Sequence, residues 1–201
     1  MTERHTHDGA IKPGLLVLVV GPSGVGKDTL LDAARERLKD AAHICFPRRC
    51  ITRPAGSVGE IHIPVRPEDF AQMARQGAFL LSWKAHDLCY GIPRHVQEDV
   101  ANGKTVIVNV SRSVIEDARS LIGHGQVRVL NIRASRDVLR KRLEARGRED
   151  ILDIERRLAR ASAYQIDGDN IVHVDNDADL ETGIARFIAA IEIDQAIANR
   201  A

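Results

Sequence analysis

The sequence of 201 residues has little of several features that would place it in a specialised class. Its three cysteines, Cys45, Cys50 and Cys89, form an odd set without C-x-x-C spacing. We therefore expect reduced cytoplasmic thiols rather than a disulfide framework or a zinc site. Lys and Arg (29) nearly balance Asp and Glu (28), and the net charge is +1. That balance excludes a bulk field that would draw the protein to nucleic acid or to a membrane surface.

The chain also has no long hydrophobic run. The longest apolar run near the N-terminus, Leu15 to Val20, is far too short to span a bilayer. The residues before it lack the basic-then-apolar layout of a secretory signal, and we expect residues 1–13 to form a flexible tail. These absences predict a cytoplasmic protein without nucleic-acid or membrane partners, whose affinity for anions must be local.

Apolar runs alternate with segments of helical periodicity along the rest of the chain. Buried strands are predicted at 15–20, 105–110, 127–132 and 171–174, a mixed strand at 45–52, and extended chain at 79–86. Helices are predicted at 27–38, 66–77, 95–102, 113–122, 135–145 and 180–197. This order indicates an α/β fold, with a parallel sheet flanked by helices, in one domain over residues 14–198. Strict alternation fails at 53–94 and 146–165, so the core is assigned to 14–52, 95–145 and 166–198.

A glycine-rich loop, GPSGVGKDT, joins the first predicted strand to the first predicted helix. Glycines let successive N–H groups point at phosphate oxygens without crowding the anion, and the following helix adds its N-terminal dipole. Lys27 would neutralise charge on the β- and γ-phosphates of ATP. A plain glycine turn is the alternative, but such a turn does not require Gly-Lys at a helix start. The segment predicts a P-loop NTPase fold with an ATP site at Gly21, Pro22, Ser23, Gly24, Val25, Gly26, Lys27, Asp28 and Thr29.

Asp28 departs from the usual loop, in which a Ser or Thr after the lysine binds Mg²⁺. Thr29 lies about 100° further round the helix, so it is a poor substitute for that hydroxyl. A carboxylate is also a hard oxygen ligand. We hypothesise that Asp28 supplies metal-binding charge, because the strand that ends near Asn109 and Ser111 carries no acid. The alternative is a first-turn aspartate that is favourable only to the helix dipole.

Arginines are concentrated between residues 140 and 160: Arg140, Arg142, Arg146, Arg148, Arg156, Arg157 and Arg160. Acidic residues are interleaved with them, so each arginine taken alone could belong to a solvated, salt-bridged surface. Beside a phosphate loop the segment has a second explanation. Phosphoryl transfer needs mobile cations that close over the developing charge. Gly147 would serve as a hinge, and we predict a lid over residues 146–165.

The ordered motifs resemble those of the guanylate kinase family over nearly the whole chain, from Leu15 to Ile191. GPSGVGK is similar to that family's loop, ITRPAGSVGE to its acceptor-phosphate segment T-R-P-P-R-x-G-E, and LCYGIPR to its Y-Y-G-T-P stretch. RLEARG followed by ERRL resembles its lid, and VHVDNDADLE its closing V-N-D-D-L-E. The resemblance implies a guanylate kinase-like fold with an acceptor-binding lobe at 53–94.

The departures from that family all concern the acceptor. The second arginine of T-R-P-P-R is missing, the stretch after Gly-Glu is shortened, and the strand aspartate of D-I-D is replaced within VNVSR. A pocket that hydrogen-bonds a base does not lose those groups cheaply. With its GKD, ITR, GE-x-H, LSW-x-A, YG and RLE-x-RGRE segments, the chain resembles one branch of the superfamily, the ribose 1,5-bisphosphate phosphokinases of phosphonate catabolism.

That resemblance implies transfer of the ATP γ-phosphoryl group, with Mg²⁺, to ribose 1,5-bisphosphate, which forms 5-phosphoribosyl 1-diphosphate. It implies catalytic roles for Lys27, Arg142, Arg146 and Arg157, and an acceptor site that includes Arg49, Arg53, Glu60 and Tyr90. His62, for the sugar hydroxyls, and Arg112, from its place after a strand, are further acceptor candidates. A packing role for His62 and Trp83 and a surface role for Arg112 stay open.

Rival functions follow from the same motifs. A guanylate or other nucleoside monophosphate kinase would need the base-binding groups. A non-catalytic guanylate-kinase-like module need not keep Lys27 and the lid arginines. A small-sugar kinase would want a carboxylate base, for which the sequence offers no well-placed residue. The expected partners are ATP and a small phosphorylated sugar, and a homodimer is left open.

Overall fold

The main sheet has five parallel strands in the order β2-β7-β1-β8-β9. The computed structural model describes residues 14–55, 61–147, 150–162, 166 and 168–198, so the expected tail at 1–13 lies outside the described residues. The strands are β1 (Leu15–Val20), β2 (Ile44–Cys45), β7 (Thr105–Asn109), β8 (Val127–Arg133) and β9 (Ile171–Asp175). β1 is fully buried from Leu16 to Val20, as its apolar run predicts for a central strand covered on both faces.

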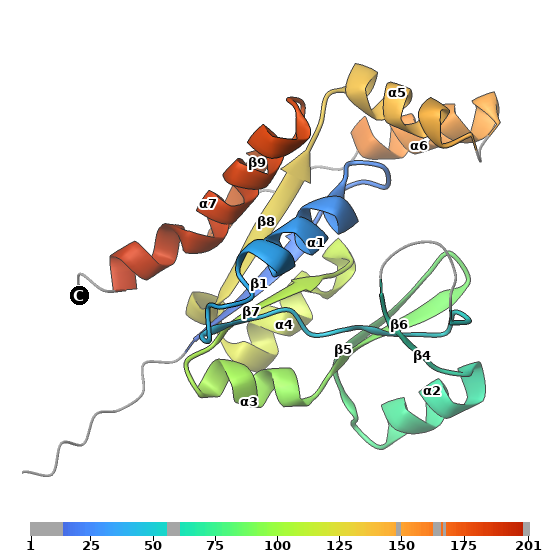
Figure 1. Cartoon of the computed structure of the whole chain (residues 1–201). Helices are drawn as coiled ribbons and strands as arrows, with labels where there is room; N and C mark the ends of the chain where they lie inside the picture. Colours follow the sequence, from blue (N-terminus) through green and yellow to red (C-terminus); the bar gives the residue numbers. More distant parts are fainter. Residues whose placement is uncertain (1–13, 56–60, 148–149, 163–165, 167, 199–201) are drawn as a thin grey trace, which may run out of the picture.

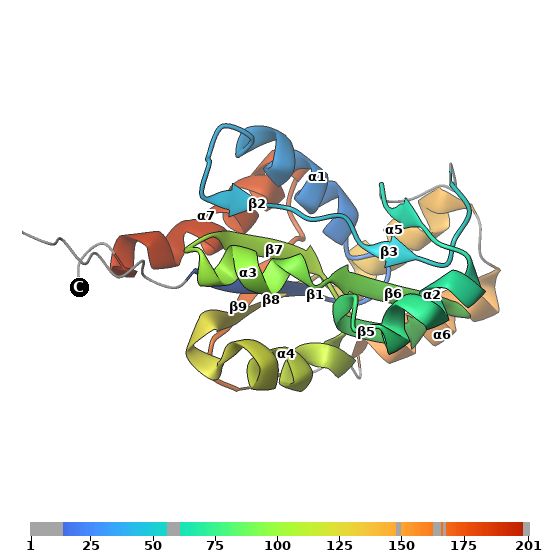
Figure 2. The ribbon, with the colours of Figure 1, turned by 90° about the horizontal axis from the view of Figure 1, so that it is seen from below.

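Helices cover both faces of this sheet (Figures 1 and 2). The helices α1 (Lys27–Arg37), α5 (Arg136–Arg146), α6 (Ile151–Ser162) and α7 (Leu180–Ala198) pack on one face, in a core that includes Phe187. The helices α3 (His95–Ala101) and α4 (Ile115–Ile122) pack on the other face. The predicted α/β fold is therefore confirmed. Within the described ranges, no helix is both long enough and apolar enough to cross a membrane.

A second sheet, β4-β3-β6-β5, extends beyond one end of the main sheet (Figure 1). Its strands are β3 (Cys50–Ile51), β4 (Ile63–Pro64), β5 (Phe79–Ala85) and β6 (Leu88–Pro93), and the helix α2 (Pro67–Arg75) packs on it. Phe70 of α2 stacks on Phe79 of β5, with ring centroids 4.5 Å apart. A Cβ at Gly91 would lie 2.6 Å from the Phe79 ring, so the packing of this small sheet needs a glycine there.

One expectation about the strands was wrong, and one strand was missed. The single mixed strand predicted at 45–52 is two strands in different sheets, β2 and β3, with Pro47 between them. Proline has no N–H to donate, so it interrupts a strand ladder at that point. β6 was not predicted, because the hairpin turn before it uses His86 (φ 51°) and Asp87 (φ 60°) instead of glycine.

Candidate active site

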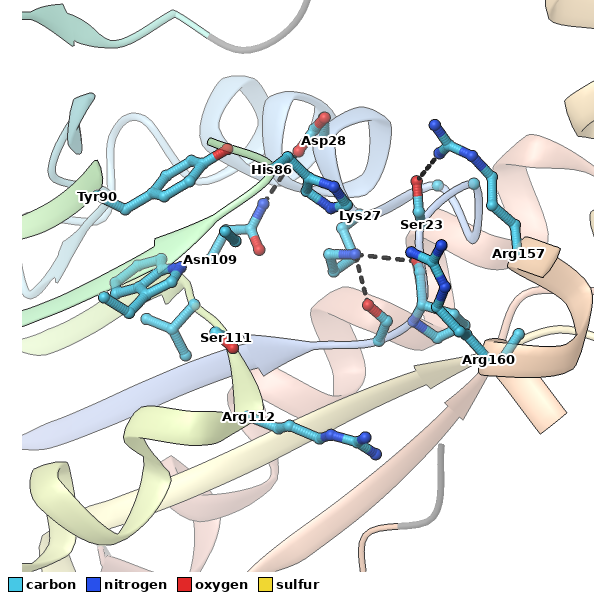
Figure 3. A pocket seen from close by; sticks show the side chains of 18 of the residues that line it. Ser23, Lys27, Asp28, His86, Tyr90, Asn109, Ser111, Arg112, Arg157 and Arg160 are labelled. Carbon is cyan, nitrogen blue, oxygen red and sulfur yellow. Dashed lines mark hydrogen bonds between the residues drawn. The ribbon is translucent and has the colours of Figure 1, made fainter. Parts of the chain in front are cut away.

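A pocket of about 750 Å³ lies at the carboxyl-terminal ends of β1 and β7, where open α/β sheets bind their ligands (Figure 3). Four groups of residues line it, and the first three are the phosphate loop with the first turn of α1, the end of β7 with the turn that follows, and side chains on or beside the second sheet. The helix α6 contributes a fourth group, Asp153, Arg157, Arg160 and Ala161. The pocket therefore joins segments that are far apart in the sequence.

The phosphate loop wraps around its own lysine. The Lys27 ammonium donates to the carbonyl oxygens of Gly21 at 2.7 Å and Pro22 at 3.0 Å. Gly26 has a φ of 99°, and a Cβ there would lie 2.7 Å from Nδ2 of Asn176. A Cβ at Gly21 would lie 2.6 Å from the carbonyl oxygen of Ile132. The sequence argument explained these glycines by crowding of a bound anion, and the structure adds that the protein itself excludes a side chain at both positions.

Arg142 holds this loop from behind. Its guanidinium donates to the carbonyl oxygens of Val25 at 3.1 Å and Asn176 at 2.8 Å. Asn176, which is 5% exposed, donates its Nδ2 to the same Val25 oxygen at 2.8 Å. Arg142 is absent from the described residues that line the pocket. In this placement Arg142 contacts the loop from outside the described pocket lining, and the catalytic role that the family resemblance implies stays a prediction.

The arginines of α6 face the pocket instead (Figure 3). Arg157 donates to Oγ of Ser23 in the phosphate loop at 2.7 Å. Arg160 lies one helical turn further along and also lines the pocket, together with Asp153. Sequence reasoning did not assign Arg160 to the site, although its spacing of three from Arg157 was a usable signal. Arg146 ends α5, and its side chain is outside the described part of the chain.

Two arginines of α5 make the salt-bridged surface that was the alternative explanation for this segment. Arg136 and Arg140 donate to the two oxygens of Glu155 on α6, at 2.9 Å and 2.6 Å. The hydrogen bond from Arg140 is the main cause that lowers the pKa of the Glu155 carboxyl. These contacts join α5 to α6, so the predicted lid segment is the second arm of a helical hairpin.

On the opposite side of the pocket, Arg49 is held by an aromatic pair. Trp83 and Tyr90 stack with ring centroids 5.3 Å apart, and the Arg49 guanidinium carbon lies 5.7 Å and 5.2 Å from the two centroids. Arg49 also donates to the carbonyl oxygen of Asn109 at 3.0 Å. Trp83 lines the pocket and is not simply a core residue, which its apolar neighbours in the sequence did not reveal.

The other expected acceptor residues are placed unevenly. Arg53 and Arg112 line the pocket. His62 is absent from the described lining, and its Nε2 lies 3.1 Å from the carbonyl oxygen of Arg53, which is the packing role left open above. Glu60 lies outside the described residues.

Asp28 is exposed at the start of α1 and lines the pocket. Its Oδ1 accepts a hydrogen bond from Nδ2 of Asn109 at 3.0 Å. Sequence reasoning noted Asn109 only as a position without an acid. The contact between the two could not be read from residues that are so far apart in the chain.

Comparisons with known proteins agree with this architecture. A family model described as an AAA domain matches residues 17–162. A protein of Rhizobium etli named ribose 1,5-bisphosphate phosphokinase PhnN is 41% identical over 191 residues, which are 94% of this chain and 95% of that protein. Its namesake in Pseudomonas fluorescens is 43% identical over 89% of this chain and 95% of that protein.

Longer relatives also match. A bifunctional ribose 1,5-bisphosphokinase-thymidine phosphorylase of Cupriavidus pinatubonensis is 46% identical over 89% of this chain, which spans only 29% of that protein. Among solved structures, a guanylate kinase from Anaplasma phagocytophilum has a TM-score of 0.63 at 18% identity, with 91% of this chain and 87% of that chain covered. A gluconokinase from Sinorhizobium meliloti has a TM-score of 0.53 at 18% identity, with 94% and 98% covered. These structures support the guanylate kinase-like fold and say nothing of the substrate.

Proposed function

We propose that this chain, which belongs to the ribose 1,5-bisphosphate phosphokinase family, transfers the γ-phosphoryl group of ATP to ribose 1,5-bisphosphate, with formation of 5-phosphoribosyl 1-diphosphate and ADP. The observation that carries the proposal is a single pocket with a phosphate loop on one side and Arg49 and Arg53 on the other. Both reactants are anions, so a phosphate-to-phosphate transfer needs positive charge on both sides of the reacting bond.

On the donor side, Lys27 and the loop N–H groups would bind the β- and γ-phosphates of ATP. Binding would exchange the hydrogen bonds of Lys27 to Gly21 and Pro22 for bonds to phosphate oxygens. The bond between the γ-phosphorus and the oxygen that bridges the β- and γ-phosphates breaks, and that oxygen stays with ADP. An oxygen of the acceptor phosphate forms the new bond to the γ-phosphorus. That oxygen is already ionised at neutral pH, so the transfer needs no general base.

The lid is proposed to be residues 146–165, with the acceptor lobe at 53–94. Arg157 and Arg160 would stabilise charge on the transferring group, because both reach the pocket from α6. Arg146 keeps its proposed catalytic role from the lid match. For Arg142 the same role would require the exchange of its two hydrogen bonds, to the carbonyls of Val25 in the loop and of Asn176 after β9, and we propose that it positions the loop.

The acceptor is proposed to bind at Arg49, Arg53, Tyr90 and Arg112, with Glu60 and His62 as further candidates. The aromatic pair and the Asn109 carbonyl hold the Arg49 guanidinium in place, so little side-chain entropy would be lost when a phosphate binds. Catalysis would then consist of positioning and charge stabilisation.

Mg²⁺ is proposed at Asp28, and the residues fit a hard cation. One carboxylate oxygen accepts from Asn109, and the other has no partner within the described ranges. No group of three His, Cys, Asp or Glu in the described chain could hold a metal alone, so phosphate oxygens and water would complete the coordination. When bound, the ion would neutralise charge on the donor phosphates. The place in phosphonate degradation, the cytoplasmic location and a homodimer stay predictions.

The test is an ATP-consumption assay that compares ribose 1,5-bisphosphate with GMP and identifies the products by mass spectrometry. We expect 5-phosphoribosyl 1-diphosphate and ADP from the sugar and little turnover of GMP. Lys27→Ala should lower kcat/KM at least 100-fold, by about the effect of losing one charge-stabilising group. Lys39→Ala is the matched control, because Lys39 is an exposed lysine paired only with Glu36. Turnover of GMP without turnover of the sugar would make this chain a nucleoside monophosphate kinase.

A further inference from the structure

Asn109 is a buried residue at the end of β7, and both its backbone carbonyl and its side-chain NH₂ group have hydrogen-bond partners. The residue is 8% exposed and lines the pocket. Its backbone carbonyl accepts from Arg49 at 3.0 Å, and its Nδ2 donates to Oδ1 of Asp28 at 3.0 Å. Its Oδ1 has no partner among the residues that the structure describes. Figure 3 shows that oxygen turned away from Asp28.

The chemistry of Asp28 determines which way the amide points. A carboxylate accepts hydrogen bonds and donates none, so the NH₂ group of Asn109 must face it. The amide oxygen therefore must face the opposite way, on the pocket side. This oxygen is not among the buried polar atoms that lack a partner in the described residues, so water can reach it from the pocket, and a donor of a bound ligand can take the place of that water.

The ligand group that fits this oxygen is a hydroxyl. Phosphate oxygens are themselves acceptors, so they would bind the arginines around the pocket and be repelled by an amide oxygen. Ser111, the next polar residue in the pocket, is already engaged. Its Oγ accepts from the backbone N–H of Ser113 at 3.3 Å, and Oγ of Ser113 donates to it at 2.9 Å.

We propose that Oδ1 of Asn109 accepts a hydrogen bond from a ring hydroxyl of the acceptor sugar, so that Asn109 is a specificity-determining residue. This inference rests on the proposed function and adds the substrate group that the pocket recognises between its phosphate-binding cations. Asp28 has a second part in this arrangement, because it fixes the orientation of the amide that reads the hydroxyl.

The experiment compares ribose 1,5-bisphosphate with its 2-deoxy and 3-deoxy analogues. For the wild-type protein, kcat/KM should fall about tenfold for one of the two analogues, which is the size expected for one hydrogen bond. For Asn109→Ala, the ratio of kcat/KM for ribose 1,5-bisphosphate to kcat/KM for that analogue should be less than about twofold, and kcat/KM for ribose 1,5-bisphosphate itself should be lower than in the wild type. A thermal melt of the variant checks that it is folded.

Asn131→Ala is the matched control, because Asn131 is a buried amide of β8 that is 2% exposed and is not among the described residues that line the main pocket. We expect it to leave the ratio between ribose and deoxyribose substrates as in the wild type.

Three results overturn the inference. One is a wild-type protein that does not distinguish the sugar from either analogue, which needs no variant. Another is an Asn109→Ala protein in which kcat/KM falls by the same factor for all three substrates, so that their ratios stay as in the wild type. That result would indicate a structural role for Asn109. The third is an Asn109→Ala protein that needs more Mg²⁺ than the wild type to bind ADP in a calorimetric titration, while its kcat/KM ratio between the sugar and the deoxy analogue is unchanged. That result would make the amide a metal-site residue. Failure of the proposed function looks different, since the wild-type protein would then turn over none of the sugar bisphosphates.

Discussion

Replacing Arg142 by alanine removes two hydrogen bonds, one to the carbonyl of Val25 in the phosphate loop and one to the carbonyl of Asn176 behind it. The carbonyl of Val25 would keep its other donor, Nδ2 of Asn176 at 2.8 Å. The carbonyl of Asn176 would lose the 2.8 Å bond, in a residue that is 5% exposed. A hydrogen bond from a charged donor contributes about 1.5–3 kcal/mol. Because Arg142 itself is only half-buried, we expect the free energy of unfolding to fall by about 2 kcal/mol.

Denaturant unfolding and thermal melting measure this loss directly. For a chain of this size, about 2 kcal/mol corresponds to a fall in Tm of roughly 4–8 °C. ADP binding should weaken as well, because the loop would lose its support. Lys141→Ala is the control, since Lys141 is an exposed neighbour on the same helix. The reasoning fails if Arg142→Ala melts like the wild type but no longer transfers phosphate. Arg142 would then act on the transferring group, as the lid match implied.

Two further predictions concern the loop and the helical hairpin. Gly26→Ala should lower the free energy of unfolding in urea by about 1–3 kcal/mol, because the new Cβ would lie 2.7 Å from Nδ2 of Asn176 and the residue has a φ of 99°. Gly125→Ala is the control and should lower it far less, because no heavy atom lies within 4 Å of the new Cβ. The contact of Glu155 with Arg140 lowers the pKa of the carboxyl, so its stabilising effect is present above the unfolded pKa, about 4.3, and is lost as pH falls through the lower folded value. The protection factors of the α6 amides, which correct for the pH dependence of intrinsic exchange, should therefore fall in that acid range for the wild type but not for Glu155→Gln, and an equal fall in both would contradict the assignment.

Local patterns predicted the elements that build the donor side of the site. The apolar run of β1, the glycine loop and the periodicity of α1 are all contained within 15–38, and the structure agrees with them to within a residue. The elements on the acceptor side of the site were harder to predict. β3 and β4 have two residues each, which is too short for an alternating pattern to show. The turn at His86 and Asp87 contains no glycine that would mark it. The sequence around these elements therefore did not predict them.

Contacts between distant residues account for what sequence reasoning missed in the site. Asn109 meets Asp28 across 81 positions of chain, and Asn176 meets Val25 across 151. Both are single amides at or just after the ends of parallel strands. Their partners depend on strand order, which places β7 and β8 on either side of β1. No residue pattern within a segment reveals such an order.

The different roles of the arginines follow from helix geometry in the same way. On α5, Leu139 and Leu143 are buried, and Arg142 lies beside that stripe, so its side chain reaches inward to the loop. Arg136 and Arg140, four apart, lie on the face that meets Glu155. On α6 the buried pair is Ile154 and Leu158, which turns Arg157 and Arg160 toward the pocket. In the proposed lid, an arginine on α6 would move with that helix, whereas Arg142 is bonded to the loop on which the lid would close. For that reason we expect substitutions on α6 to change turnover with little change in stability, and substitution of Arg142 to change both.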